Sequence, residues 1–310
     1  MVLRNRTRER TGYRGRLAPS PTGALHLGHA RTFLVAWLRA RRAEGEIALR
    51  IEDLDPPRTV PGAADAIRRD LEWLGLDWDG EVQFQSTRGD AYRDALHRLE
   101  VAGHIYPCTC SRAEIAAVAR APHDDGELGL HYPGTCRRGP SHPERPAAIR
   151  FRMPGTPPPF VDGLLGEVDA SAWGGDFVVA RADGLFAYQL AVVVDDLAQG
   201  ITEVVRGDDL LSSTPRQIAL SGALGAEPPE YLHVPILLGA DGGRLAKRDG
   251  SLGIGELREA GVSAERVVGA LAETLGMPGD PVPAEVLVPL FDLARVPRGR
   301  AVMPALLPVG

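Results

Sequence analysis

The sequence lacks any long apolar run and any secretion signal. No stretch approaches the roughly 20 consecutive apolar residues that a membrane-spanning helix needs. Residues 1–13 are rich in arginine but contain no apolar segment of the kind that drives secretion. We therefore expect a cytoplasmic monomer with no membrane partner, in which residues 1–13 form a disordered leader.

Cysteine is also scarce, and the chain carries only three. An odd number of cysteines does not build a disulfide framework, and Cys108 and Cys110 are too close in sequence to staple a fold. This usage indicates a reducing compartment, where thiols either bind a metal or remain free.

Lysine is nearly absent. The chain has 35 lysine and arginine residues together, and Lys247 is its one lysine. A compact ammonium differs from a guanidinium in shape and hydration, so Lys247 is a candidate for a role that arginine cannot fill. The alternative is chance, in a genome whose base composition favours arginine.

The chain does not have an excess of positive charge, since its formal net charge is −6. Non-specific RNA binding over a wide face is therefore not expected, because such binding depends on neutralising many phosphates. Local basic patches remain possible at residues 4–16 and at Arg39, Arg41 and Arg42, although ordinary solvated faces would look the same.

What the sequence does have is an alternation of strand and helix patterns. Residues 14–18 and 46–51 read as strands, while residues 27–42, 63–74 and 92–101 read as helices. This order predicts an α/β protein with a Rossmann-like, doubly wound parallel sheet.

The second half of the chain interrupts this pattern and then resumes it. The stretch 108–145 is rich in proline, glycine and histidine, and short β segments follow near Phe151, Val161, Val168 and 177–180, with a hairpin turn at Asp183-Gly184. Apolar runs at 185–194 and 201–205 are expected to return to the core sheet, followed by a helix at 210–224, a strand at 233–238 and a helix at 264–275. We divide the chain into a first catalytic half (14–107), a zinc-containing insertion (108–175), a second catalytic half with a lysine loop (176–250) and a short helical C-terminal segment (251–310).

Two short motifs suggest phosphate binding. His26-Leu27-Gly28-His29 follows a strand and a Pro/Gly turn and begins a helix, where backbone N–H groups and the helix dipole attract anions. Arg244-Leu245-Ala246-Lys247-Arg248 lies in a glycine-rich loop, where an ammonium could follow a phosphate through a reaction. Each motif alone could be incidental: a pair of polar histidines, or a solvated basic turn.

A third pattern suggests a metal. Cys108, Cys110 and Cys136 supply three thiolates, which suit a tetrahedral zinc that needs one more ligand. The residues in range for the fourth position are His104, His123, His131 and Tyr132. A zinc with four protein ligands would be structural, and the alternative is three free thiols on a loop.

Taken together, the motifs resemble the catalytic domain of glutamyl- and glutaminyl-tRNA synthetases over roughly residues 14–275. The phrase RLAPSPTGALHLGHARTFLVAWLRAR contains the HIGH motif of that family at 26–29, and residues 244–248 match its KMSKS motif. The resemblance continues through ALRIEDLDPPR, LEWLGLDWD and YLHVPILL. Ala246 and Arg248 replace two serines of the second motif, whereas Lys247 is retained.

The resemblance implies roles for particular residues. The catalytic residues would be His26, His29 and Lys247, which with Gly28 would bind ATP and its Mg²⁺. The glutamate pocket would be formed by Arg16, Ala18, Ser20, Glu52, Tyr188 and Arg206. Without the resemblance, Glu52 and Arg206 would read as solvated strand ends.

Within the family, the chain resembles the glutamyl-queuosine tRNA(Asp) synthetase branch. The phrase RGDDLLSSTPRQ at 206–217 belongs to this resemblance, which also implies a structural zinc held by Cys108, Cys110, Tyr132 and Cys136. We expect no helical anticodon-binding domain, because residues 248–310 are expected to form only a short helical segment. The implied activity is tRNA-independent activation of glutamate by ATP, followed by transfer to the queuosine base in the anticodon arm of tRNA(Asp). The alternatives are a truncated synthetase that charges the tRNA 3′ end, an H-x-G-H nucleotidyltransferase and a non-catalytic regulator.

Overall fold

The computed structural model describes residues 12–118, 132–238, 253–304 and 306. Its first sheet is parallel, with the order β1-β2-β3, and consists of β1 (Arg14–Leu17), β2 (Glu46–Ile51) and β3 (Gln83–Phe84). β1 and β2 are almost wholly buried, and each buries one arginine, Arg16 in β1 and Arg50 in β2, among its otherwise small or apolar buried residues.

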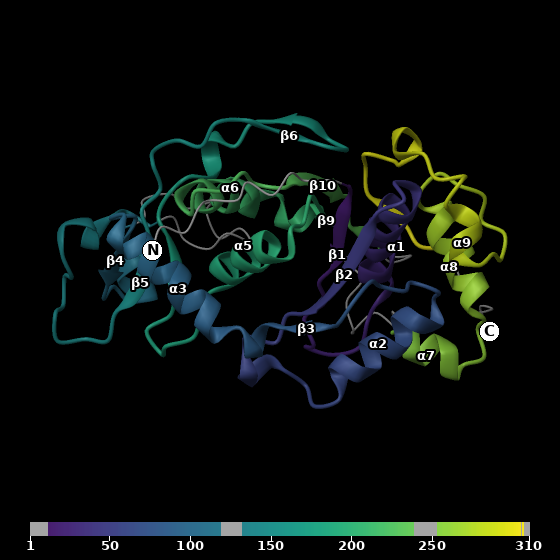
Figure 1. Cartoon of the computed structure of the whole chain (residues 1–310), viewed down its shortest axis with the longest axis horizontal. Helices are drawn as coiled ribbons and strands as arrows, with labels where there is room; N and C mark the ends of the chain where they lie inside the picture. The colour runs from purple at the N-terminus through teal and green to yellow at the C-terminus, as the bar shows by residue number, and fades with distance from the viewer. Residues whose placement is uncertain (1–11, 119–131, 239–252, 305, 307–310) are drawn as a thin grey trace, which may run out of the picture.

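A second sheet continues this arrangement. Its order is β7-β6-β10-β9, from β6 (Phe160–Asp162), β7 (Gly166–Val168), β9 (Glu203–Gly207) and β10 (Glu230–Val234), and β10 runs parallel to both β9 and β6. β9 lies beside β1, where the Thr202 N–H donates to the Arg14 carbonyl at 2.8 Å. The strands therefore follow one another across the molecule as β3, β2, β1, β9, β10 and β6 (Figure 1), an α/β architecture with parallel sheets.

Helices cover these strands. α1 (Leu27–Arg42) packs on β1 and β9, and Leu34, Val35 and Leu38 are among its buried residues. α5 (Tyr188–Gln199) packs between α3 (Gly89–Val101) and α6 (Thr214–Ala223). The other helices are α2 (Ala63–Trp73), α4 (Arg112–Val118), α7 (Ile254–Glu259), α8 (Ala264–Glu273) and α9 (Ala284–Leu287). Short 3-10 turns lie at Pro56–Arg58, Gln85–Thr87, Thr135–Arg138, Ser171–Trp173, Asp208–Ser213 and Leu293–Arg295, and β11 (Leu237–Leu238) pairs with β12 (Ala301–Val302).

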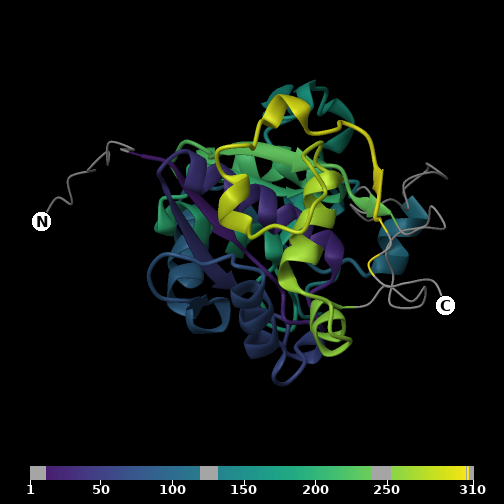
Figure 2. The same cartoon turned by 90° about the vertical axis from the view of Figure 1, so that its right-hand side faces the viewer.

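A third sheet is antiparallel, with the order β4-β5-β8, from β4 (Ile105–Cys108), β5 (Ala148–Phe151) and β8 (Phe177–Ala180). Its pairing crosses the boundaries that we predicted at residues 108 and 176. This sheet lies at one end of the molecule and the C-terminal helices α7 to α9 at the other (Figure 1). In Figure 2 these yellow-green helices face the viewer; α8 packs on α1, α7 on α2 and α9 on α8.

The sequence predicted most of these elements correctly. The helix at 27–42 and the strand at 46–51 have the predicted bounds. The predicted hairpin turn at Asp183-Gly184 is also present, because the chain folds back there and Phe186 forms an antiparallel bridge with Ala180 at the end of β8. The expected return of 185–194 to the sheet is wrong, because this apolar run enters helix α5 at Tyr188. The expected strand at 233–238 instead begins at Glu230 and breaks after Val234, where Pro235 cannot donate to a ladder.

Among the described residues, no helix combines the length and the apolarity that crossing a membrane requires.

Candidate active site

The residues predicted to bind glutamate gather at the carboxyl ends of the parallel strands. Arg16 lies near the end of β1, Glu52 follows β2, and Arg206 lies near the end of β9. Tyr188 begins α5, and the charged groups that act on its hydroxyl include Arg206, Glu52 and Arg16. Since ligands of open α/β sheets bind outside the carboxyl ends of the strands, this gathering marks a candidate active site.

The turn after β1 brings the remaining two predicted residues to the same place. The Pro19 carbonyl accepts a hydrogen bond from the Glu52 N–H at 2.9 Å, which fixes this turn beside Glu52. Ala18 on one side of Pro19 is half-buried, and Ser20 on the other side is exposed.

A buried ion-pair network underlies the site. The fully buried guanidinium of Arg50 lies 2.7 Å from Asp196 and 3.2 Å from Glu52, and Asp196 lies 3.8 Å from Arg16. Arg50 also donates to Gln199 at 2.7 Å. Sequence reasoning missed Arg50 and Asp196, although each interrupts an apolar run (ALRI and VVVDDLA) and could have been found as an internal charge.

Burial perturbs the ionisable groups of the site. It lowers the pKa of Arg16, with Asp196 acting in the opposite direction, and it raises the pKa of Glu52 against the effects of Arg50 and Arg16. Burial also raises the pKa of the Tyr188 hydroxyl. Charges in such a shielded site interact more strongly than they would in water, so a ligand that carries both signs of charge would be held well.

Arg206 is anchored on several sides. Its Nε donates to His233 Nε2 at 3.0 Å, its Nη1 to Gln217 Oε1 at 2.7 Å and its Nη2 to Thr214 Oγ1 at 2.8 Å. The guanidinium also lies over the Tyr231 ring, 5.1 Å from its centroid. Sequence reasoning found Arg206 but none of these partners, because they come from a neighbouring strand and helix.

The H-x-G-H motif forms the start of α1. His26 is the N-cap residue, and its Nδ1 accepts a hydrogen bond from the His29 N–H at 3.3 Å. The two imidazole rings stack with their centroids 3.7 Å apart. His29 is exposed, but partial desolvation by the surrounding protein and the adjacent His26 ring lower its pKa, so it is neutral at pH 7. The half-buried Gly28 lies between the two histidines, so the motif presents two stacked imidazoles at a helix N-terminus, a favourable position for an anion.

The lysine motif, including Arg244, Lys247 and Arg248, lies outside the described residues, but its flanks are defined. Gly253 forms a β-bridge with His26, and the Ile254 N–H donates to the Leu25 carbonyl at 2.8 Å. On the other side of the motif, β11 packs against α1. Both described flanks of the segment 239–252 therefore contact the H-x-G-H region or its helix.

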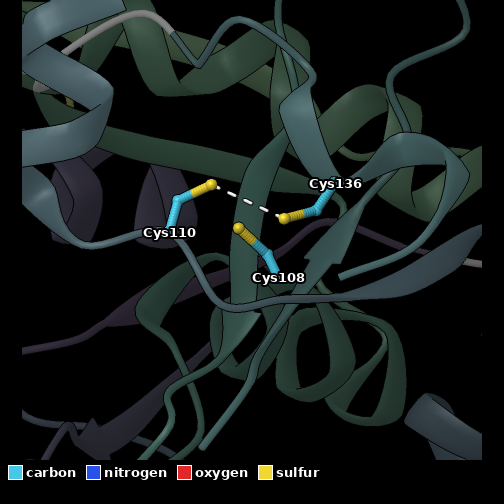
Figure 3. Close-up of side chains that lie close together, drawn as sticks. All are labelled: Cys108, Cys110 and Cys136. Carbon is cyan, nitrogen blue, oxygen red and sulfur yellow. Dashed lines mark hydrogen bonds between the residues drawn. The ribbon is translucent and has the colours of Figure 1, made fainter. Parts of the chain in front are cut away.

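Three cysteine sulfurs converge at the end of β4 (Figure 3). The Sγ atoms of Cys108, Cys110 and Cys136 all lie within 4.8 Å of one another, and Cys110 and Cys136 are 3.5 Å apart. Tyr132 points its hydroxyl at the same point, 3.3 Å from Cys108 Sγ and 3.7 Å from Cys110 Sγ. A zinc–sulfur bond of about 2.3 Å implies sulfur separations of roughly 3.8 Å in a tetrahedron, so the cluster fits a zinc ion.

The surroundings of the cluster bear on the fourth ligand. Of the histidines in the described residues, none joins the three cysteines within 4.8 Å, and His123 and His131 lie outside the described residues. Ser141, which the sequence reasoning missed, places its Oγ 3.4 Å from Cys136 Sγ and 3.7 Å from Cys110 Sγ. The geometry therefore leaves Tyr132 and Ser141 as oxygen candidates.

A cavity of about 530 Å³ lies beside the cysteine cluster rather than at the strand ends, lined by Tyr132, Pro133, Gly134, Thr135, Arg137, Arg138, Gly175 and Asp176. Arg137 Nε donates to Asp176 at 2.6 Å, so these two lining residues neutralise each other. The perturbed groups of this cavity pair with one another or belong to the cysteine cluster, whereas the strand ends carry buried charges of both signs at the carboxyl edge of a parallel sheet, so we place the candidate active site at the strand ends.

Comparison with known proteins identifies the family of the chain. Residues 13–280 match the family described as tRNA synthetases class I (E and Q), catalytic domain. A protein of Symbiobacterium thermophilum named glutamyl-Q tRNA(Asp) synthetase is 50% identical over 309 residues, which cover 94% of this chain and 96% of the relative. A protein of Geobacter sulfurreducens with the same name is 56% identical over 248 residues, or 79% of this chain and 78% of the relative.

Solved structures agree on the fold. The glutamate tRNA ligase of Elizabethkingia meningosepticum, solved in complex with its amino acid, superimposes with a TM-score of 0.80 at 28% identity. The match covers 95% of this chain and 67% of that protein.

Proposed function

The chain belongs to the glutamate and glutamine (E and Q) group of class I tRNA synthetases, and on that premise we propose that it activates glutamate with ATP and transfers it to the queuosine base of tRNA(Asp). It is a ligase of the aminoacyl-tRNA synthetase type. The observation that carries the choice of reaction is the identity of about half of all residues, over nearly the whole chain, with relatives named for it.

The pocket at the strand ends suits glutamate. Glutamate carries two carboxylates and one ammonium, and the site offers the guanidinium groups of Arg16 and Arg206 together with the carboxylate of Glu52. Tyr188 adds a hydroxyl that can orient the ligand. Glutamine would leave one arginine without a carboxylate partner, which costs on the order of a few kcal/mol, so we propose that the site prefers glutamate.

The phosphates of ATP would bind at the N-terminus of α1. In the first step the α-carboxylate of glutamate attacks the α-phosphorus of ATP and releases pyrophosphate. His26 and His29, with the backbone around Gly28, would stabilise the phosphates, and Lys247 would follow the charge that develops on pyrophosphate. Mg²⁺ is expected to accompany ATP, and no side chain needs to act as a nucleophile.

The cysteine cluster would hold a structural zinc through Cys108, Cys110 and Cys136, with Tyr132 as the proposed fourth ligand. When bound, the ion would tie the end of β4 to the segment that contains Tyr132 and Cys136. No step of the proposed reaction uses the metal.

The second step would transfer the glutamyl group to RNA. The cyclopentenediol of queuosine has two adjacent hydroxyls, as does the 2′,3′-diol of a terminal ribose. An enzyme built for ester formation at one diol could therefore act on the other without a new catalytic group. The anticodon arm of tRNA(Asp) is then the RNA partner.

Labelled glutamate tests the proposal directly. We expect incorporation into tRNA(Asp) that contains queuosine, even after its 3′-terminal adenosine has been removed, and none into tRNA(Asp) that lacks queuosine. Labelling that ignores queuosine and disappears when the terminal adenosine is removed would instead identify an enzyme that charges the tRNA 3′ end. ATP–pyrophosphate exchange without tRNA tests the first step alone, and equal rates with glutamate and glutamine would contradict the pocket assignment.

A further inference from the structure

Three adjacent strands place a row of polar side chains behind the candidate active site. Asp162 ends β6, His233 lies in β10, and Arg206 lies in β9, where it is the register partner of His233. His233 and the side chain of Asp162 are fully buried, and Arg206 is 4% exposed. A buried row of this kind needs an explanation, because desolvating these groups is costly unless each finds a partner.

The hydrogen bonds along the row run in one direction. His233 Nδ1 lies 2.6 Å from Asp162 Oδ2, and His233 Nε2 lies 3.0 Å from Arg206 Nε. Because a guanidinium only donates, His233 Nε2 must accept, and its Nδ1 must then carry the proton that is donated to Asp162. The Asp162 carboxylate is held in turn by the backbone N–H groups of Leu164, Leu165 and His233.

The row also keeps the positive charge on Arg206. Burial, together with the cation of Arg206, lowers the pKa of His233 to about 4 despite its bond to Asp162. His233 is therefore neutral at pH 7 and offers Arg206 a lone pair without neutralising it. The hydrogen bonds of Arg206 to the described residues use three of its five N–H groups, so two N–H groups are left for a ligand.

We propose that His233 is a positioning residue: Asp162 fixes its ring, and the ring fixes the guanidinium of Arg206 in the orientation that receives a carboxylate of glutamate. The preference for glutamate over glutamine then depends on His233, although His233 does not touch the substrate. This inference rests on the proposed function of the site as a glutamate pocket.

Two substitutions at the same position separate the two halves of the row. His233→Asn places an amide nitrogen near the former Nδ1 and keeps a donor for Asp162, but it removes the acceptor of Arg206. His233→Gln places an amide oxygen near the former Nε2 and keeps the acceptor of Arg206, but it removes the donor to Asp162. A role that only stabilises the fold does not predict that the Asn variant is the poorer enzyme for glutamate.

The measurement is ATP–pyrophosphate exchange with glutamate and with glutamine, alongside thermal unfolding of each variant. We expect His233→Asn to raise the KM for glutamate by about 10- to 100-fold, because a hydrogen bond to a charged group is lost. The KM for ATP should be unchanged, and discrimination against glutamine should be reduced. His233→Gln should stay within about fivefold of the wild type by the same reasoning. Equal effects, or a poorer Gln variant, would overturn the proposal.

A second measurement does not depend on the variants folding. Nitrogen-15 NMR of the imidazoles in the wild-type protein at pH 7 should show one neutral histidine protonated at Nδ1, with an Nε2 resonance that shifts when glutamate is added. A buried histidine protonated at Nε2 would overturn the proposal, because Arg206 could not then donate to it. If the wild-type protein shows no glutamate-dependent exchange, the proposed function fails, whereas the protonation state of His233 still tests the row by itself.

Discussion

At the scale of single residues, the candidate site depends on charges that are buried and mutually paired. Arg50 is fully buried and lies 2.7 Å from Asp196, which also faces Arg16. Such a network contributes less to stability than its Coulomb attraction suggests, because both partners lose hydration. Removing one partner is different, since it leaves a buried charge without compensation.

We therefore predict that Asp196→Asn lowers the free energy of unfolding by about 3 kcal/mol and also weakens glutamate binding. Asparagine keeps the shape of aspartate, so the loss reports charge rather than packing. Urea denaturation measures the first effect, and the KM for glutamate in pyrophosphate exchange measures the second. Asp94→Asn, on the exposed face of α3, is the matched control and should change stability by less than about 0.5 kcal/mol. Equal stability of the two variants would contradict the network.

The lowered pKa of His233 predicts how stability depends on pH. The pKa of this histidine is about 4 in the folded protein, below its value of roughly 6.5 in an unfolded chain. As pH falls below roughly 6.5 the unfolded chain binds a proton that the folded protein does not, so the free energy of unfolding should fall by up to about 3 kcal/mol on approaching pH 4.

Denaturation of the wild type and of His233→Gln across this range isolates the contribution of His233. The pKa of His29 is lowered as well, but both proteins retain His29, so its effect cancels in the comparison. The difference between the two proteins should shrink as pH falls from 6.5 to 4, and a constant difference would show that His233 titrates normally.

At the scale of helices and strands, the hydrophobic pattern of the sequence correctly predicted elements that are bounded by clear turn signals. The strand at 46–51 and the helix at 27–42 have clear breaks on either side and were predicted with correct bounds. The run 185–194 was misassigned because a fully buried helix and a buried strand have the same apolar composition, and only packing between α3 and α6 distinguishes them. The hydrogen bonds that hold Arg206 could not be predicted for a related reason. Asp162, His233 and Arg206 become neighbours only because β6, β10 and β9 are adjacent in the sheet, and this strand order is not a local property of the sequence.

The turn between α1 and β2 gives a prediction about glycine. A Cβ on Gly45 would clash with the Tyr13 carbonyl oxygen. Gly45→Ala must therefore push apart the backbone segments at which β1 and β2 begin, and it should lower the free energy of unfolding by about 2 kcal/mol or more. Gly222 lies in α6 with open space around its Cβ position, so Gly222→Ala should raise stability by about 0.5–1 kcal/mol. Thermal unfolding of both variants checks the opposite signs, and a Gly45→Ala variant as stable as the wild type would refute the turn geometry.

The cysteine cluster gives a prediction about metal. Protein purified without chelator should contain about one zinc per chain, and Cys110→Ser should lose most of it, because three thiolates define the site. Tyr132→Phe and Ser141→Ala then decide the fourth ligand, since each removes one of the two nearby hydroxyls. Metal analysis with competition by a chelator measures both effects.

The variant that loses zinc affinity identifies the oxygen ligand. Unchanged affinity in both variants would transfer the role to a residue outside the described part of the chain, such as His123 or His131. Absence of zinc from the wild-type protein would contradict the site altogether.

At the scale of the whole molecule, the net charge of −6 restricts how the protein meets RNA. Each phosphate contact needs a local cation and contributes about 0.9 to the slope of log affinity against log salt for a duplex, and somewhat less for a single strand. We predict a slope of magnitude at most about 4 for binding to tRNA(Asp), which corresponds to roughly five phosphates or fewer. Pyrophosphate exchange measured in the same buffers without tRNA controls for effects on the active site, and a much steeper slope would indicate a basic face that the charge balance does not suggest.

The position of Asp162 in β6 determines which segments of the chain could be replaced by the matching segments of a relative in a chimeric protein. The residues between β4 and β5 contain Cys110, Tyr132, Cys136 and Ser141, and a chimera that replaces only this stretch would leave the row behind Arg206 intact. A chimera that extends past β5 would also carry a foreign β6, and with it the carboxylate that orients His233. This stretch is thus interchangeable in principle with any relative that retains Cys108 in β4, whereas the hairpin of β6 and β7 must be inherited together with the strands that carry Arg206 and His233.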